Sequence, residues 1–301
     1  MISVIICTYN REKYIYNVLE SLAKGTLNPD GYEIVLIDNN CSDNTAAQID
    51  RFEAAWPDVK LRRFIETNQG LSFARNRGIK EAKGDVLIFL DDDAFPRPDY
   101  LSTITSVMSS HPEINCFGGE IVPQFEDEKK PEWLCDWNLS WVSGLKMSGG
   151  LKEFSKKYPI GANMGFRKVV FEICGLFNTS LGRSKGNLMG GEEKDIFQRI
   201  GNAGFKIYYI PGIDVIHMIP PSRTSLEYVA RLGLGVGMSE RIRCKALGPA
   251  AFVRRVLSEA VKWCGTLVLW FRYALEGRSA CGNSLLLFRS NVTKGLTGCR
   301  Q

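Results

Sequence analysis

The stretch that decides the fold is VLIFLDDDAFPRP, residues 86–98, where an apolar run ends in three adjacent carboxylates and then turns on two prolines. A short continuous apolar run is typical of a strand that is buried on both faces. Adjacent carboxylates without a cation raise one another's pKa values, and a hard divalent ion commonly relieves the repulsion. The stretch therefore predicts a buried strand that ends in a charged site, with a solvated acidic turn as the alternative.

The chain upstream repeats this alternation of buried runs and helical spacing. We predict strands over residues 2–7, 32–37, 60–65 and 85–90, separated by helices over residues 11–24, 45–55 and 71–82. Strands that alternate with helices predict an α/β fold, in which a parallel sheet carries helices on both faces.

Polar clusters follow the predicted strands. Residues 8–11, 38–40 and 91–93 stand at three strand ends, and residues 68–75 begin a loop and helix that could reach the same edge. Ligands of parallel sheets bind outside the carboxyl ends of the strands. We therefore expect one crevice lined with carboxylates and amides.

The three aspartates suit a site for a metal ion and a diphosphate. Alternate side chains of an extended chain point the same way, so Asp91 and Asp93 would face one side and Asp92 the other. Such a pair can hold Mg²⁺ or Mn²⁺ and leave positions for phosphate oxygens. The chain has neither a P-loop nor a GxGxxG motif, so the metal must carry much of the phosphate recognition. Asp38 could accept from a ribose hydroxyl or a uracil-type N–H, or merely cap a turn.

A second acidic group, GGEEKD, covers residues 190–195 at a predicted helix start. Capping of the helix explains one carboxylate there, but a glycine-rich stretch upstream is what a substrate-gated site needs. Glu192 or Glu193 could then be the general base for an acceptor hydroxyl. His217 follows the last predicted strand, residues 205–210, and is either structural or a third metal ligand through a ring nitrogen.

The C-terminal part is basic. From Pro221 onward the chain carries 13 Lys/Arg and 4 Asp/Glu, whereas the preceding residues carry 25 and 29. This asymmetry suggests an anionic partner, either a membrane surface or nucleic acid. Residues 226–245 and 250–275 have helical spacing, and the second stretch mixes two kinds of side chain, apolar Val256, Trp263, Leu267, Trp270 and Phe271 with basic Arg254, Arg255, Lys262 and Arg272. That composition predicts an interfacial membrane helix and favours lipid over nucleic acid, with a helical hairpin that covers the domain as the alternative.

Three further features bear on the cellular setting. Trp133, Trp137 and Trp141 recur every four residues, which indicates a helical stripe packed on the core or a platform for a sugar or lipid acceptor. The nine cysteines are scattered without a CxxC pair, which suggests free thiols in a reducing compartment. No signal peptide is recognised at the start and no apolar run reaches 18 residues. We expect a cytoplasmic protein, peripheral at the inner face of the membrane.

Four motifs in order resemble the GT-A nucleotide-sugar glycosyltransferases of family 2: SVIICTYNR (3–11), IVLIDNNCSDNT (34–45), NQGLSFARNRGI (68–79) and DVLIFLDDDAFPRPDYL (85–101). Two later segments, YPIGANMGFRK (158–168) and GGEEKDIFQRI (190–200), resemble the acceptor-side half of that family, including its ED-x-x-L-x-x-R-L pattern. The resemblance covers residues 2–218 and leaves the tail uncovered.

The resemblance implies an inverting, metal-dependent transfer of a sugar from a nucleotide-diphosphate sugar to an acceptor hydroxyl. It implies that the nucleotide is bound by Thr8, Tyr9, Arg11, Asp38, Asn68 and Arg75. It also makes Asp91 and Asp93 the ligands of the metal and diphosphate, places Asp92 against the ribose or sugar, and lets His217 complete the metal site. The family's base is the Asp of its Glu-Asp pair. Here that position is Glu193, with Glu192 as a rival.

We therefore predict a GT-A catalytic domain over residues 1–220, with a nucleotide-binding half (1–100) and an acceptor half (101–220), and a basic helical extension over 221–301. The predicted role is cell-surface polysaccharide or glycolipid biosynthesis on a glycan or lipid-linked acceptor, with Mn²⁺ or Mg²⁺ as cofactor and no nucleic-acid partner. A non-catalytic sugar-nucleotide or glycan-binding module is one alternative. A sugar nucleotidyltransferase is another, but it would want a glycine-rich phosphate loop that TYNREKY lacks.

Overall fold

The computed structural model describes residues 1–155, 157–184, 186 and 188–298. The chain forms two compact units. The sheet unit comprises residues 1–123, 143–179 and 193–218, and the helical unit comprises residues 124–142, 180–192 and Ile219 onward. The division of the chain by function at residue 220 stays a prediction, while two stretches before that residue, 124–142 and 180–192, pack with the helical unit.

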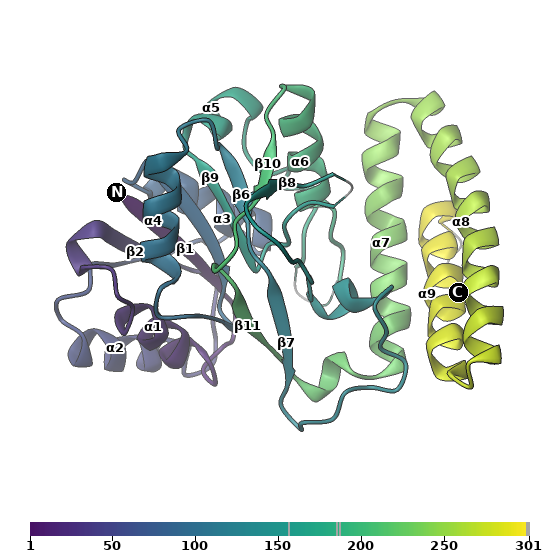
Figure 1. Ribbon diagram of the computed structural model, residues 1–301, viewed down its shortest axis with the longest axis horizontal. Coiled ribbons are helices and arrows are strands. Elements are labelled where there is room, and N and C mark those ends of the chain that lie inside the picture. The colour runs from purple at the N-terminus through teal and green to yellow at the C-terminus, as the bar shows by residue number, and fades with distance from the viewer. Residues whose placement is uncertain (156, 185, 187, 299–301) are drawn as a thin grey trace. The chain divides into compact units, whose positions relative to one another are not determined.

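The first half of the sheet unit is the predicted alternation (Figure 1). Four strands, β1 (Ile2–Thr8), β2 (Tyr32–Asp38), β3 (Leu61–Ile65) and β4 (Val86–Asp91), are parallel and stand in the order β3-β2-β1-β4. They alternate with three helices, α1 (Ile15–Ala23), α2 (Thr45–Ala55) and α3 (Leu71–Glu81). The expected α/β architecture is thus confirmed.

Beyond β4 the sheet becomes mixed. It continues through β9 (Asn163–Arg167), β6 (Cys116–Gly118), β10 (Ile207–Tyr209) and β8 (Lys152–Glu153). β9 runs antiparallel to both β4 and β6, and β10 runs parallel to β6. A separate three-stranded sheet has the order β5 (Ala94–Pro96), β11 (Val215–Ile219) and β7 (Ile121–Phe125). The remaining helices of this half are α4 (Tyr100–Ser110), α5 (Val169–Cys174) and α6 (Glu192–Asn202).

Strands β1, β2 and β4 of the large sheet are buried on both faces. Val4 and Ile6 of β1 belong to one apolar core, whereas Ile5 between them belongs to a second core with Val35 and Phe89. Successive strand side chains point to opposite faces, so a continuous apolar run supplies both cores. This arrangement fixes the strand ends, and with them the polar clusters that follow.

The helical unit contains α7 (Leu226–Ala246), α8 (Pro249–Leu275) and α9 (Ser279–Thr297), drawn in green to yellow in Figure 1. The first two match the predicted helical stretches, but α9 was not foreseen. Helices α7 and α9 approach closely at glycines: a Cβ on Gly237 would lie 2.2 Å from the Val292 carbonyl oxygen, and one on Gly295 would lie 2.3 Å from that of Leu234. Because glycine contacts carry no apolar periodicity, the sequence pattern of this pair is weak.

The predicted tryptophan helix over residues 133–141 is wrong. These residues form turns that end in the 3₁₀ helix η2 (Leu139–Val142). The Asn138 side chain accepts a hydrogen bond from the Cys135 amide (2.7 Å) and donates one to the Trp133 carbonyl (2.9 Å), and such local bonds compete with helix formation. Trp133 is buried in the helical unit, whereas Trp137 is 64% exposed.

One of the basic side chains predicted to face a membrane from α8 is buried instead. Arg255, which we predicted among the basic side chains of an interfacial helix, is buried and bonded to Glu240 (2.8 Å) and Glu259 (2.6 Å). Among the residues that the structure describes, none of the helices combines the length and the apolar character that crossing a membrane requires.

Candidate active site

The register of the sheet brings the predicted polar clusters to one edge. Thr8 at the end of β1 pairs with Asp38 at the end of β2, and Cys7 pairs with Asp91 at the end of β4. Parallel neighbours end at the same edge, so three clusters that are distant in sequence lie together there. The hydrophobic runs therefore position the site, because they set where each strand stops.

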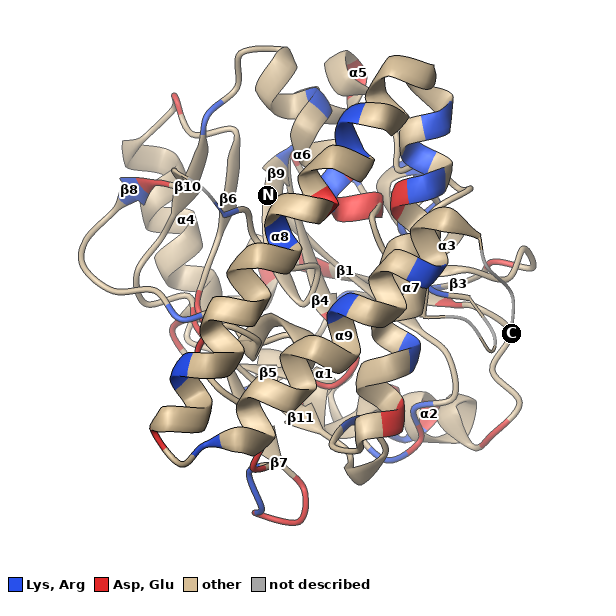
Figure 2. Ribbon diagram, turned by 90° about the vertical axis from the view of Figure 1, so that its right-hand side faces the viewer, with Lys and Arg blue, Asp and Glu red and all other residues tan. Residues whose placement is uncertain are grey.

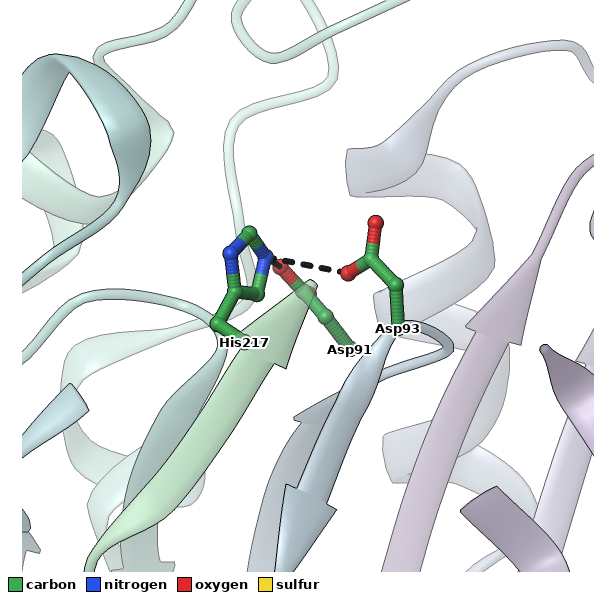
Figure 3. Close-up of side chains that lie close together, drawn as sticks. All are labelled: Asp91, Asp93 and His217. Atoms are coloured by element: carbon green, nitrogen blue, oxygen red, sulfur yellow. Dashed lines mark ion pairs between the residues drawn. The ribbon is translucent and has the colours of Figure 1, made fainter. Parts of the chain in front are cut away.

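Asp91, Asp93 and His217 form a group at this edge (Figure 3). β11 runs antiparallel to β5 and sets His217 opposite Ala94, next to the aspartates. The imidazole Nε2 lies 3.0 Å from an Asp93 oxygen and 4.0 Å from an Asp91 oxygen. One ligand atom from each residue lies within 4.8 Å of the others, and their use as a shared metal site stays a prediction.

The chemistry of this group fits a divalent cation. Carboxylate oxygens with one imidazole nitrogen suit Mn²⁺ or Mg²⁺ and leave coordination positions for phosphate oxygens. His217 is fully buried, and within the described residues its Nε2 makes no hydrogen bond although it lies at ion-pair distance from Asp93. A cation between the two side chains would satisfy both.

Asp92 points to a different partner. The Arg11 side chain donates to Asp92 (Nε to Oδ1, 3.0 Å) and also lies 3.2 Å from Asp93. Burial raises the pKa of Asp92 to about 6; Arg11 opposes that rise and Asp93 adds to it. Arg11, predicted to bind nucleotide, therefore lies within the carboxylate cluster.

The proposed nucleotide residues surround this cluster unevenly. Thr8 is buried and Tyr9 half-buried, both at the end of β1. Asp38 accepts a hydrogen bond from the Cys41 amide (2.8 Å), which is the turn-capping alternative. Asn68 is exposed in the following loop and donates to Glu66.

Asn39 is a residue whose role the sequence did not reveal. Its buried side chain donates to the carbonyls of Glu66 and Asn68 (2.8 Å each) and accepts from the Gly70 amide (2.8 Å). It thereby ties the loop that carries Asn68 to the end of β2. Its only signal was its place in the polar triplet after a buried strand.

Arg75 joins the carboxylate cluster to Glu193. This buried guanidinium on α3 lies 4.0 Å from Asp91 and 3.5 Å from Glu193. The Gly161 amide donates to the same Glu193 oxygen (2.8 Å). A Cβ on Gly161 would lie 2.0 Å from the Arg75 side chain and 2.2 Å from that oxygen, so glycine is required there. The segment YPIGANMGFRK was noted in the sequence, but this function of its glycine was not.

The two candidate bases differ in their surroundings. Glu193 groups with the sheet unit and is 22% exposed, whereas Glu192 groups with the helical unit and is 4% exposed. Glu193 has an ion pair to Arg75, and through it a link to Asp91. The glycine-rich stretch 179–191, predicted to gate the site, includes residues 185 and 187, which lie outside the described residues.

A comparison with protein families settles the class. The model of glycosyl transferase family 2 matches residues 3–174, more than half of the chain. The chain belongs to glycosyl transferase family 2. This family 2 glycosyltransferase carries its aspartate cluster, Arg75 and Gly161 inside the matched segment, whereas Glu193 and His217 lie beyond it.

Relatives of this family 2 glycosyltransferase agree. It is 26% identical over 249 residues to the glucosyl-dolichyl phosphate glucuronosyltransferase of Haloferax volcanii, covering 80% of this chain and 76% of that one. It is 31% identical to glycosyltransferase AglE of the same organism over 80% and 75% of the two chains. It shares its fold, with a TM-score of 0.65 and 17% identity, with the mannosyltransferase PcManGT of Pyrobaculum calidifontis, solved with GDP-Man and Mn²⁺, over 99% and 88% of the chains. The GT-A fold expected from the sequence is thus confirmed.

Proposed function

We propose that this glycosyltransferase moves a sugar from a nucleotide-diphosphate sugar to an acceptor hydroxyl, with inversion and with a divalent metal ion. The observation that carries the proposal is the group of Asp91, Asp93 and His217 at the strand ends, with Glu193 linked to it through Arg75. The two aspartates with His217 suit a metal ion and a diphosphate, and Glu193 suits proton removal. All four residues belong to the sheet unit.

The donor side rests on the carboxylates. Asp91, Asp93 and His217 would hold Mn²⁺ or Mg²⁺, which would stabilise negative charge on the departing diphosphate. Asp92 would contact the ribose or sugar. The remaining nucleotide contacts would come from the polar residues around this edge, Thr8, Tyr9, Arg11, Asp38, Asn68 and Arg75. The glycine-rich phosphate loops of other nucleotide sites are not needed in this arrangement.

The transfer is one displacement with one base. The Glu193 carboxylate takes the proton of the acceptor hydroxyl as that oxygen bonds to the anomeric carbon. The bond from this carbon to the diphosphate oxygen breaks, and its electron pair leaves with the diphosphate. A single in-line displacement inverts the configuration. The Gly161 amide and Arg75 both contact one oxygen of Glu193, and this contact orients the base before the acceptor arrives.

The acceptor that we propose is a lipid-linked glycan at the inner face of the membrane, in polysaccharide or glycolipid biosynthesis. The name of the first Haloferax relative, a glucosyl-dolichyl phosphate glucuronosyltransferase, supports this class of acceptor. The basic composition of the C-terminal part also supports a site of action at a lipid surface. Nucleic acid is not an expected partner.

A donor screen tests the first half of the proposal. Binding and slow hydrolysis of UDP-, GDP- and dTDP-sugars are measured with Mn²⁺, Mg²⁺ or chelator, on the wild-type protein and on Asp93→Ala. We expect one donor to bind only with metal and only to the wild type. Folded wild-type protein that binds none of these donors with metal present would overturn the catalytic proposal and favour a glycan-binding module.

The base is tested by a matched pair of isosteric variants. We expect Glu193→Gln to lower kcat by roughly 10²–10⁴-fold while donor binding persists, because the amide cannot take the proton. Glu192→Gln should retain most of the activity. The reverse order of effects would make Glu192 the base, and full transfer by both variants would contradict carboxylate base catalysis at this helix start.

A further inference from the structure

Helix α8 exposes a continuous apolar face over its whole length. The members of this α8 apolar face are Val253, Val256, Leu257, Ala260, Val261, Cys264, Leu267, Val268, Phe271, Ala274 and Leu275, all of them exposed. They recur every three or four residues, so they share one side of the helix. Val261 is 72% exposed, Val268 68% and Leu275 75%. Scattered apolar residues are normal on a surface, but a contiguous stripe of this length marks an interaction site.

The opposite side of α8 holds its polar groups. Arg255, Glu259, Thr266 and Tyr273 are the buried residues of the helix. Glu259 accepts from Arg289 of α9 (2.9 Å), and Arg255 donates to Glu240 of α7 (2.8 Å). An ordinary surface helix turns its apolar side inward. Helix α8 does the reverse, with ionic contacts to its neighbours and an apolar face outward.

The border of the α8 apolar face is cationic. Arg254 and Arg272 are exposed at the edge of the face, whereas the exposed Lys262 lies about a quarter turn further around the helix. Glu259 is the only acidic residue between 249 and 275, and it is buried. Figure 2 shows several blue segments along the ribbon of α8, and the red one belongs to the buried Glu259. Within the helix the exposed charged side chains are thus cationic, although Arg272 bonds the exposed Glu276 directly after the helix.

We propose that the α8 apolar face docks on the surface of a lipid bilayer that carries anionic headgroups. The helix would lie in the plane of the interface, with its apolar side chains in the acyl boundary and its cations at the phosphates. Long Arg and Lys side chains can reach the headgroups while their stems stay apolar. The proposal concerns the helical unit alone and does not depend on the sugar-transfer chemistry.

A second copy of this chain fits the face less well. The α8 apolar face contains eleven residues and spans about a third of the helix circumference. A coiled-coil seam is narrower, because it uses only two positions in seven. In a two-fold antiparallel pairing, each copy would also bring its cationic border against the same border of the other. Charge complementarity therefore favours an anionic lipid surface.

Vesicle sedimentation tests the proposal with the full chain. We expect the wild-type protein to pellet with phosphatidylcholine vesicles that contain phosphatidylglycerol, and less so in high salt. The double variant Leu257→Glu/Val268→Glu should lose this binding. The control is Ile173→Glu, which places the same charge at a 60% exposed apolar residue of α5; it should bind as the wild type does. Far-UV circular dichroism and thermal melting check that each variant is folded. Undiminished pelleting of the double variant would overturn the proposal.

Cys264 lies within the α8 apolar face and can carry a fluorescent label. Of the cysteines that the structure describes, it is the one classed as exposed. A polarity-sensitive fluorophore on this thiol, with Cys299→Ser to prevent labelling there, should shift to shorter wavelength on anionic vesicles. The same fluorophore on Ser110→Cys of α4, in a Cys264→Ser background, should not shift. A Cys264 probe that stays in water while the protein is bound would overturn the proposal.

Two outcomes separate this proposal from its rivals. Asp93→Ala should bind vesicles like the wild type, so loss of donor binding in that variant bears on catalysis alone. Light scattering without lipid should show a mass that Leu257→Glu/Val268→Glu does not change. A wild-type dimer that this variant splits, without vesicle binding, would make the face a self-association surface and overturn the lipid assignment.

Discussion

Each of the two units contains a cluster of charged side chains, and the two clusters differ in the ratio of carboxylates to cationic groups. In the helical unit two carboxylates meet three guanidinium groups, in a network of Glu240, Arg243, Arg255, Glu259 and Arg289. At the strand ends of the sheet unit four carboxylates share two arginines and an imidazole, in a cluster of Asp91, Asp92, Asp93, Glu193, Arg11, Arg75 and His217.

The two clusters shift pKa values in opposite directions. Burial alone would raise the pKa of Glu259, but hydrogen bonds from Arg255 and Arg289 outweigh burial and hold this pKa below its ordinary value. At the strand ends burial raises the pKa of Asp92 to about 6 in spite of Arg11. In the helical network each carboxylate is paired with arginines, which is a structural role. The strand-end cluster has an excess of negative charge, which is the condition of a site that receives a cation.

The largest expected effect separates activity from stability at the strand ends. Asp91→Asn should lower sugar transfer roughly 10²–10³-fold, because it removes a proposed ligand of the metal ion and diphosphate. It should not lower the melting temperature of the metal-free protein, because it also relieves repulsion among the aspartates. Transfer assays and melting curves in chelator measure both. Wild-type activity in this variant would contradict the assignment of Asp91.

The helical network should respond in the opposite way. Glu259→Gln leaves Arg255 and Arg289 without their shared carboxylate, and breaking a buried pair costs about 3–5 kcal/mol of unfolding free energy. Urea titration measures this loss, while donor binding by the folded fraction should persist. Glu276→Gln is the control. It removes an exposed partner of Arg272 and should leave the urea midpoint unchanged. An unchanged midpoint in Glu259→Gln would show that the network contributes little.

A smaller effect is expected at Gly161, whose amide bonds the proposed base, Glu193. Gly161→Ala would drive a methyl group into Arg75 and Glu193, and such misplacement costs roughly 10–10²-fold in kcat. Gly150→Ala, which has open space around it, is the matched control. Equal rates for the two variants would refute the orienting role.

The smallest effect is a dependence of stability on pH. The pKa of Glu259 is lowered in the folded state, so its contribution is present above the unfolded pKa of about 4.3 and is lost as pH falls through the folded pKa. Between neutral pH and pH 3 the wild-type protein should therefore lose more stability than Glu259→Gln. Urea midpoints across this range give the comparison, and parallel curves would rule the contribution out.

The sequence predicted well whatever depends on neighbours along the chain. The apolar runs that end in polar clusters placed the strands, and the Asp91–Asp93 triplet and His217 then fell at one edge. Local composition could not show which cation meets which carboxylate. The sequence predicted Arg255 to be a membrane-facing cation, whereas in the structure it donates a hydrogen bond to Glu240 of α7.

What the sequence could not show are contacts made across large separations. Gly161 touches Arg75 and Glu193 from a different part of the chain, and nothing around it in sequence signals a base. Helix α9 packs on α7 through glycines, which leave no periodic apolar signal. The tryptophan repeat is an exception among the local patterns, because the Asn138 side chain bonds the neighbouring backbone into turns.

The contact between Asp93 and His217 has a consequence for how the chain folds. It joins Asp93, which follows β4, to His217 of β11, far apart in the sequence, so it closes a very long loop. Contacts of this kind carry a large entropic cost and form late. A cation held there should therefore leave the folding rate almost unchanged and slow unfolding instead. Bound Mn²⁺ would then increase the kinetic stability of this enzyme.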